Sequence, residues 1–481
     1  MPDKPRGDDR MKFSDTKERH HMANNMDLSH DLAKFASNTR FEDLPPQAVD
    51  AAKKSLLDTI GVMLGASGME PATKPLIELV SEAGGKEEAS ILGFGGRVPA
   101  GAAAFANGTL AHGLDYDSQT PWGAHPDSSL VPALLALAER KGGVTGQELV
   151  TAVAVGQELF IRLRCNVGWH MDWNLSGAVG VYSGVAACGA LLGLSSTQIA
   201  HAMGIVSLTA GGTMEQIFGI GSNLRGLYAG FIAQSCVNAV LLAQKGMLGM
   251  ENLFEGEAGI FKVYFNGEYN REKMLENLGS EYLCAGMTYK YWPAVGNAHT
   301  YIHAAIELAR ENPIVIEDIQ TVRVYVGDFA QRMTAPLDER KKPKTMMDAK
   351  FSLPFTVALA LVKGKMSIWD FSTDALEDVQ VLALANKVEP VFDESFNWNL
   401  KLPDGKVELV MHDGRRIERL GSEVPGTPER PMTWEELRQK FSECAEASIH
   451  PVPFENVKRV QDLIQDIETC DDVIEVLALV R

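Results

Sequence analysis

Apolar residues recur at helical spacing through the first half of the chain. From Asp27 onward they fall three and four positions apart, and the same spacing runs from Leu44 to Gly61, where two prolines stand near the first turn. Further helices are expected at residues 130–140, 146–162, 196–206 and 226–244. Because the alternation typical of strands is scarce before residue 280, this part is predicted to be all-helical.

The pattern changes after residue 280. Residues Ile319–Gly327 alternate between apolar and polar, as a half-buried strand does, and Val407–Ile417 indicates a second strand that runs into an Asp-Gly hairpin turn. Helices are expected beside them at residues 298–310, 353–362 and 379–388. The predicted fold class is therefore mostly α, with an all-helical large domain and a smaller α+β domain.

Both ends of the chain differ from the middle. Residues 1–26 are polar and charged and lack the apolar stretch of a signal peptide, so they are predicted to be a disordered tail. After residue 428 the helical pattern resumes, with Thr433 as a predicted N-cap, and residues 429–481 are expected to return to the first domain. This divides the chain into the tail, a helical part at 27–279, an α+β domain at 280–428 and the closing helical segment.

Charge and cysteine usage restrict the class of partner. The net charge of −18 at pH 7 opposes binding to nucleic acid or to an anionic membrane surface, although a pocket can still be locally basic. Residues 176–194 carry no charge, but they consist largely of Gly, Ala and Ser and are predicted to form a buried helix rather than a membrane span. Six scattered cysteines without a CxxC motif favour a reduced, cytoplasmic protein.

One short segment is dense in ionisable side chains. Residues Asn107–Pro126 hold His112, Asp115, Asp117 and His125 among three glycines, between apolar flanks, which favours a functional loop over a solvated one. Two other interpretations stay open: a buried, capped turn with satisfied histidines, or a divalent-ion site formed by the same four side chains. Ligands at this spacing in one loop arise readily by chance, so no metal is expected.

Seven stretches, in order along the chain, resemble the MmgE/PrpD family, also called the 2-methylcitrate dehydratase family. They are Leu44–Pro46 with Leu57–Gly61, Asn107–Pro126, Gly221–Gly226, Phe254–Gly259, Lys290–His299, Asp348–Phe355 and Pro425–Phe441. The resemblance covers about residues 27–475. It implies a helical domain with a lid-like α+β domain, a site in the cleft between them, a homodimer, and no metal or organic cofactor.

Members of this family act at carbon next to carboxylate in small polycarboxylates. Removing a proton from such a carbon adds negative charge to an anionic substrate, so the site needs a base, cations or hydrogen-bond donors, and exclusion of water. The resemblance assigns catalytic roles to His125, for proton transfer, to Asp115, which is expected to orient the imidazole or bind a substrate hydroxyl, and to Lys290, whose free ammonium is expected to bind a substrate carboxylate. Arg225 is expected to bind a substrate carboxylate, with Asp117 either in the site or capping a turn.

Further substrate contacts are expected from Gln119, His170, Asn174, His299 and Lys350. The chain departs from the family's decarboxylases at four positions. Arg225 stands where they have lysine, Asn174 where they have a second histidine, Gln119 where they have threonine and Phe355 where they have tyrosine. His170 can replace the histidine only if the backbone there is helical, since four residues make one turn.

These departures argue against cis-aconitate decarboxylase itself and also against 2-methylcitrate as the substrate. The leading hypothesis is a cofactor-independent hydro-lyase, of the 2-methylcitrate dehydratase type, that acts on a small hydroxylated di- or tricarboxylate. An isomerase that removes and returns the same proton is the nearest alternative, followed by a decarboxylase. A binding protein that lost its catalytic groups is a third possibility. A dinucleotide enzyme is set aside, because the glycine-rich runs at residues 93–99 and 219–226 lie outside any strand–turn–helix pattern.

Overall fold

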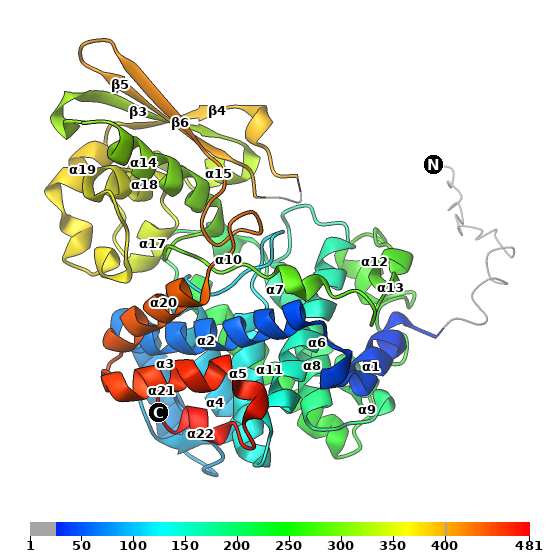
Figure 1. Cartoon of the computed structure of the whole chain (residues 1–481). Coiled ribbons are helices and arrows are strands. Elements are labelled where there is room, and N and C mark those ends of the chain that lie inside the picture. The colour runs from blue at the N-terminus through cyan, green and yellow to red at the C-terminus, as the bar shows by residue number, and fades with distance from the viewer. Residues whose placement is uncertain (1–25, 400–401) are drawn as a thin grey trace, which may run out of the picture.

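The computed structural model describes residues 26–399 and 402–481, which form a helical body and a smaller cap above it (Figure 1). The predicted tail therefore lies, apart from Met26, outside the described residues. The mostly helical fold class with a smaller α+β part is confirmed.

The body is built from α1–α13. Their bounds are α1 Leu28–Asn38, α2 Pro46–Met69, α3 Thr73–Ala83, α4 Ala100–Gly113, α5 Asp127–Lys141, α6 Gly146–Cys165, α7 Leu175–Ala178, α8 Gly180–Leu191, α9 Ser196–Val206, α10 Glu215–Phe218, α11 Leu224–Gln244, α12 Ile260–Tyr264 and α13 Arg271–Leu275. The two-residue strands β1 Ala89–Ser90 and β2 Arg97–Val98 form a small antiparallel pair. The helices expected from the sequence are present, with ends that differ by several residues.

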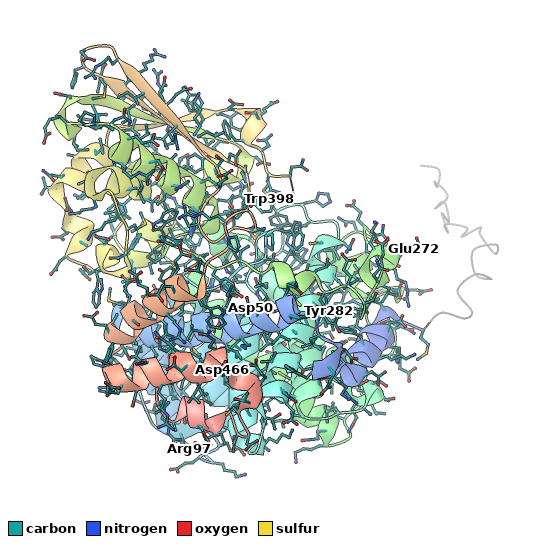
Figure 2. All side chains as sticks on the ribbon, in the orientation of Figure 1. Asp50, Arg97, Glu272, Tyr282, Trp398 and Asp466 are labelled. Atoms are coloured by element: carbon teal, nitrogen blue, oxygen red, sulfur yellow. The ribbon has the colours of Figure 1, made fainter. Side chains whose placement is uncertain are left out.

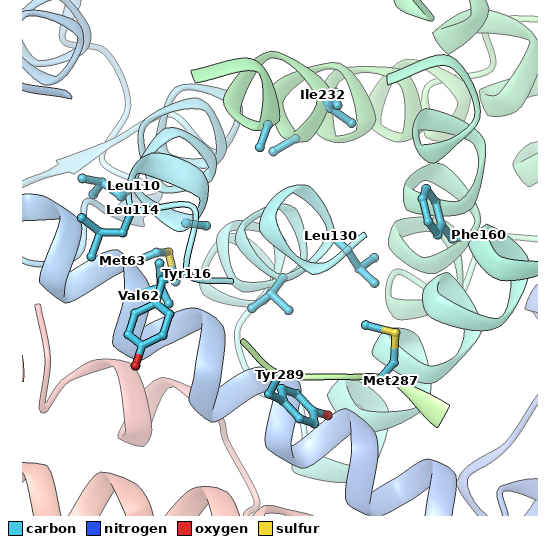
Figure 3. Packing of buried hydrophobic residues seen from close by; sticks show 14 of the residues in the cluster. Val62, Met63, Leu110, Leu114, Tyr116, Leu130, Phe160, Ile232, Met287 and Tyr289 are labelled. Carbon is cyan, nitrogen blue, oxygen red and sulfur yellow. The ribbon is translucent and has the colours of Figure 1, made fainter. Parts of the chain in front are cut away.

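Helix α11 occupies the centre of the body and packs against α4, α5, α8 and α9. Small residues permit the α4–α11 crossing, since a Cβ on Gly108 would lie 2.8 Å from the Cα of Gly230. By length and composition α11 could cross a membrane, but 61% of its most apolar 18-residue window is buried inside the protein. Figure 3 shows part of this packing, with Ile232 on the inner side of α11.

The predicted buried helix at 176–194 is two helices. α7 ends at Ala178 and α8 begins at Gly180, because the backbone leaves the helical path at Val179, with φ −118°. The prediction of a single helix is therefore wrong, and the break matters because α7 begins directly after Asn174, whose side chain caps it by accepting from Ser176 N.

The cap holds a four-stranded sheet in the order β4-β3-β5-β6, with α14, α18 and α19 on one side (Figure 1). Its elements are α14 His299–Glu311, β3 Ile319–Val326, α15 Asp328–Arg332, α16 Leu337–Lys341, α17 Met346–Lys350, α18 Leu353–Lys363, α19 Val379–Ala385, β4 Val388–Phe392, β5 Gly405–Met411 and β6 Arg416–Gly421. β3 pairs in parallel with β4 and antiparallel with β5, and Gly414, at φ 87°, turns the β5–β6 hairpin. The expected helix at 379–388 ends early, since Val388 already begins β4.

The chain then returns to the body through α20 Trp434–Glu446, α21 Phe454–Gln465 and α22 Ile474–Leu477. α20 and α21 pack against α2, and Thr433 caps α20 in a reciprocal arrangement with Glu436. The crossing segment before the cap also rests on α2, because Tyr289 donates its hydroxyl to the Ala51 carbonyl at 2.7 Å (Figure 3). Body and cap are thus joined through two chain crossings.

Candidate active site

A cavity of about 100 Å³ lies where the body meets the cap. The body contributes the loop between α4 and α5, the end of α6, the start of α7 and Tyr228 of α11. The cap contributes Phe329, Phe351, Trp398 and Leu402, and Figure 2 labels Trp398 at this junction. Aromatic side chains from both domains line this small, partly open cavity and would shield part of a bound ligand from water.

The loop between α4 and α5 carries the predicted functional residues, and three lysines from distant parts of the chain hold it. Each lysine donates to one of three successive carbonyls: Lys350 to Leu114 at 2.6 Å, Lys290 to Asp115 at 2.8 Å, and Lys440 to Tyr116 at 2.6 Å. Asp115 itself adopts φ +48°, a conformation that side-chain-bearing residues rarely take. The lysines therefore fix a strained turn at the floor of the site.

His125 is oriented by two acceptors on one ring nitrogen. Its Nδ1 lies 2.9 Å from the Ser118 carbonyl and 3.3 Å from Asp117 Oδ2. A carbonyl only accepts, so Nδ1 carries a proton and Nε2 is the nitrogen left for the cavity. This arrangement suits proton transfer by Nε2.

Asp117 is buried between two imidazoles. It also lies 2.9 Å from His112 Nδ1, and these two histidines hold the pKa of its carboxyl well below the usual range despite burial. Asp117 is therefore the carboxylate that orients His125. The sequence interpretation gave that role to Asp115, and the structure corrects it, because Asp115 faces Lys290 instead.

The cluster His112, Asp117 and His125 is compact enough to hold a metal ion, since one ligand atom from each lies within 4.8 Å of the others. The same atoms are engaged with one another: Asp117 lies against Nδ1 of both histidines, and His125 Nδ1 also lies against the Ser118 carbonyl. The three side chains form a hydrogen-bonded relay.

Lys290 and Asp115 form a buried ion pair, with Nζ 2.8 Å from Oδ1. Burial acts to raise the pKa of Asp115, but Lys290 and the two histidines outweigh it and the net pKa is lowered. Lys290 lines a second, larger cleft of about 560 Å³, and not the cavity that contains His125. Its charge is therefore compensated inside the protein, in contrast to the free ammonium expected from the sequence.

Two other expected cations, Arg225 and Lys350, also lie outside the cavity. Arg225 stacks over the Phe351 ring at 4.0 Å and donates to the Gly219 carbonyl, so it lies behind a ring that faces the cavity. Burial lowers its pKa to about 10. Lys350 is bound to Leu114, and burial lowers its pKa to about 8. Neither side chain lines the cavity.

The remaining predicted contacts divide into two groups. Gln119 and Asn174 line the cavity, as does Asp115. His299 lines the larger cleft, lies 3.2 Å from the Ala294 carbonyl, and is kept neutral by burial, which lowers its pKa to about 3. His170 is exposed and pairs with Glu268 at 2.9 Å. Since the backbone at residue 170 is not helical, His170 does not replace the missing histidine.

Sequence reasoning missed several polar residues of the cavity, among them Arg164, Tyr228, Asn297 and Trp398. The available signal was a second arginine in the last turn of α6, after Arg162, and an asparagine inside the Lys290–His299 stretch. Tyr228 packs edge-on against His112 at 4.7 Å between ring centres, and burial raises its pKa far above the usual value, so its hydroxyl keeps its proton. No local pattern marks Trp398.

Comparisons with known proteins agree with this architecture. Residues 30–272 match the MmgE/PrpD N-terminal domain and residues 292–466 match the MmgE/PrpD C-terminal domain. The chain is 28% identical to a cis-aconitate decarboxylase-like protein of Aspergillus oryzae, over 94% of this chain and 96% of that one. It is 24% identical to the human cis-aconitate decarboxylase, over 89% of each chain, and 23% identical to the Escherichia coli 2-methylcitrate dehydratase, over 82% and 84%.

Proposed function

Because the chain belongs to the MmgE/PrpD family, we propose that it is a cofactor-independent hydro-lyase acting on a small hydroxylated di- or tricarboxylate. Its relatives include dehydratases and decarboxylases, which supports a lyase of small carboxylates. The observation that carries the finer proposal is His125, whose Nδ1 is held by Ser118 and Asp117 while Nε2 is left to the cavity.

In the proposed reaction, neutral His125 takes the proton from the carbon next to a carboxylate. The electron pair of that C–H bond forms a carbon–carbon double bond, and the C–O bond on the neighbouring carbon breaks. The leaving oxygen takes a proton and departs as water. Tyr228 lines the same cavity and is the candidate donor of that proton, which is then replaced on the Tyr228 oxygen by the proton that His125 took from carbon.

Asp117 stabilises the imidazolium that forms on His125, as a carboxylate does when it accepts from the far ring nitrogen. The carboxylate next to the reacting carbon gains charge as the proton leaves, and the cavity offers N–H donors for it. Aromatic side chains from the cap cover part of the cavity and reduce the access of water.

The test is turnover of hydroxylated di- and tricarboxylates in heavy water, followed by proton NMR. We expect an unsaturated product and loss of water with the unaltered protein. His125→Ala should lower the rate by 100-fold or more, within the range of general-base catalysis, because it removes the proposed base.

The matched control is His170→Ala, which removes an exposed histidine outside the cavity and should leave the rate unchanged. Incorporation of deuterium without loss of water would indicate the epimerase alternative and overturn the hydro-lyase. Release of carbon dioxide would indicate a decarboxylase instead.

A further inference from the structure

The cavity is lined by buried N–H donors that have no partner. They are Arg164 Nη1, Asn174 Nδ2, Asn297 Nδ2 and Trp398 Nε1. Buried donors are almost always satisfied in folded proteins, so four of them around one small cavity point to an absent ligand that is rich in acceptors. A carboxylate, which only accepts, has that chemistry.

Arg164 differs from the other three because it carries charge. Its side chain is 2% exposed, and it forms no ion pair with any residue that the structure describes. The one carboxylate lining the cavity, Asp115, is already paired with Lys290. The cavity therefore contains one buried guanidinium without a counter-ion.

Arg225 is another buried arginine without an ion pair among the described residues, and its Nε and Nη1 have no partner, but unlike Arg164 it does not line the cavity. Arg162, two residues earlier on α6, is bound to Glu158 at 2.6 Å and to three carbonyls. Arg340 is bound to three carbonyls. Arg164 donates Nη2 to the Trp122 carbonyl at 2.5 Å and Nε to Gly123 at 3.4 Å, which fixes its plane and leaves Nη1 free.

The hydrogen bonds to Trp122 and Gly123 also fix the position of the Arg164 guanidinium. Trp122 and Gly123 belong to the turn that leads into His125, so the guanidinium is anchored two and three residues from the catalytic imidazole. Trp169 lies alongside, with its ring centre 5.6 Å from the Arg164 guanidinium carbon. Burial lowers the pKa of Arg164, yet an arginine keeps its proton near neutral pH.

We propose that Arg164 binds a carboxylate of the substrate and so determines specificity for a di- or tricarboxylate over a monocarboxylate. This inference rests on the proposed function and extends it. Arg164 supplies the cation that Lys290 and Arg225 do not bring to the cavity. Asn297 and Trp398, from the cap, are placed to donate to the same bound anion.

The probe is tricarballylate, a trianion without a hydroxyl group, which binds without turnover. Its Kd is measured by calorimetry over a range of salt concentrations. Arg164→Gln should weaken binding tenfold or more and make the dependence of Kd on salt shallower, because one charge contact is lost. Arg164→Lys should recover part of the affinity, since it keeps charge without the planar fork.

Arg310→Gln is the matched control, because it changes the net charge equally at an exposed position on α14, and it should leave Kd unchanged. Unaltered affinity in Arg164→Gln would overturn the inference. Weaker binding with the original salt dependence would overturn it as well, because Arg164 would then act only by holding the 122–123 turn. If Arg164→Gln does not fold, an unweakened Arg164→Lys overturns the inference.

Failure of the proposed function has a different result. In that case the unaltered protein binds neither tricarballylate nor the hydroxylated acids used for turnover, and both proposals fall together. If the unaltered protein binds tricarballylate and the Arg164 variants bind it equally well, only the inference about Arg164 is overturned.

Discussion

At the scale of single residues, the site depends on which charges are paired. Asp115 and Asp117 are both buried aspartates two positions apart, yet one is bound to a lysine and the other to two histidines. This difference assigns them separate tasks. Asp117 orients the imidazole of His125, whereas Asp115 and Lys290 together hold the turn.

The Asp115–Lys290 pair makes a testable contribution to stability. Lys290→Met leaves Asp115 as an uncompensated buried carboxylate, which costs about 3–5 kcal/mol. Adding Asp115→Asn removes that charge, so the double variant should be more stable than Lys290→Met alone. Urea unfolding of both variants and of Asp115→Asn measures the coupling, and strict additivity of the single effects would contradict a direct pair.

At the scale of elements, short polar links between helices position the loop. Asp127, in the first turn of α5, accepts from Ser118 Oγ at 2.5 Å and from Gln157 of α6 at 2.8 Å. Gln157 also donates to Ser55 of α2. Three helices are thus tied together behind His125, and the ties are buried.

This network predicts a pH dependence of stability. Burial raises the pKa of Asp127 to about 6, above its ordinary value of 3.8. The folded state therefore binds a proton at Asp127 more tightly than the unfolded chain does. As a result, the contribution of Asp127 to the free energy of unfolding falls as the pH rises from about 4 to about 6 and is constant above that. The shift corresponds to about 3 kcal/mol.

Asp127→Asn cannot ionise and should lack this fall, which chemical denaturation between pH 4 and pH 7 measures. Asp462→Asn, on the exposed side of α21, serves as a control carboxylate. Parallel stability curves for the unaltered protein and Asp127→Asn would contradict the raised pKa.

At the scale of the whole molecule, one apolar face of the helical body is exposed to solvent in the single chain. Leu224, Phe231 and Leu242 are exposed along α11, seven and eleven residues apart, so they share one helix face. Phe105 of α4 packs edge-on against Phe231 at 4.8 Å. Large exposed apolar faces on folded proteins commonly mark interfaces.

We expect this face to form the homodimer contact that the family resemblance implies. Phe231→Glu should shift the protein toward monomer in sedimentation velocity, because it places a charge in an apolar interface. Phe454→Glu makes the same substitution at an exposed phenylalanine of α21 and should leave the oligomeric state unchanged. A dimer that survives Phe231→Glu unchanged at micromolar concentration would place the interface elsewhere.

The local sequence was sufficient for most elements. Helical spacing located α5, α6, α9 and α11, and the Asp-Gly pair located the β5–β6 turn, because these features depend on neighbours within a few residues. The local sequence was less reliable where a helix cap lies just before an apolar run. The small apolar residues at 176–194 indicated one helix, but Asn174 caps a separate short helix at its start.

Sequence by itself determined the family, the mostly helical class with its α+β cap, and the loop that holds His125, because these follow from local pattern and from motifs in order. Tertiary structure decided which charges remain available. Asp115 cancels Lys290, Phe351 screens Arg225, and Arg164 is left unpaired in the cavity. The Asp115–Lys290 and Phe351–Arg225 pairings join groups more than one hundred residues apart, and spacing along the chain carries no information about them.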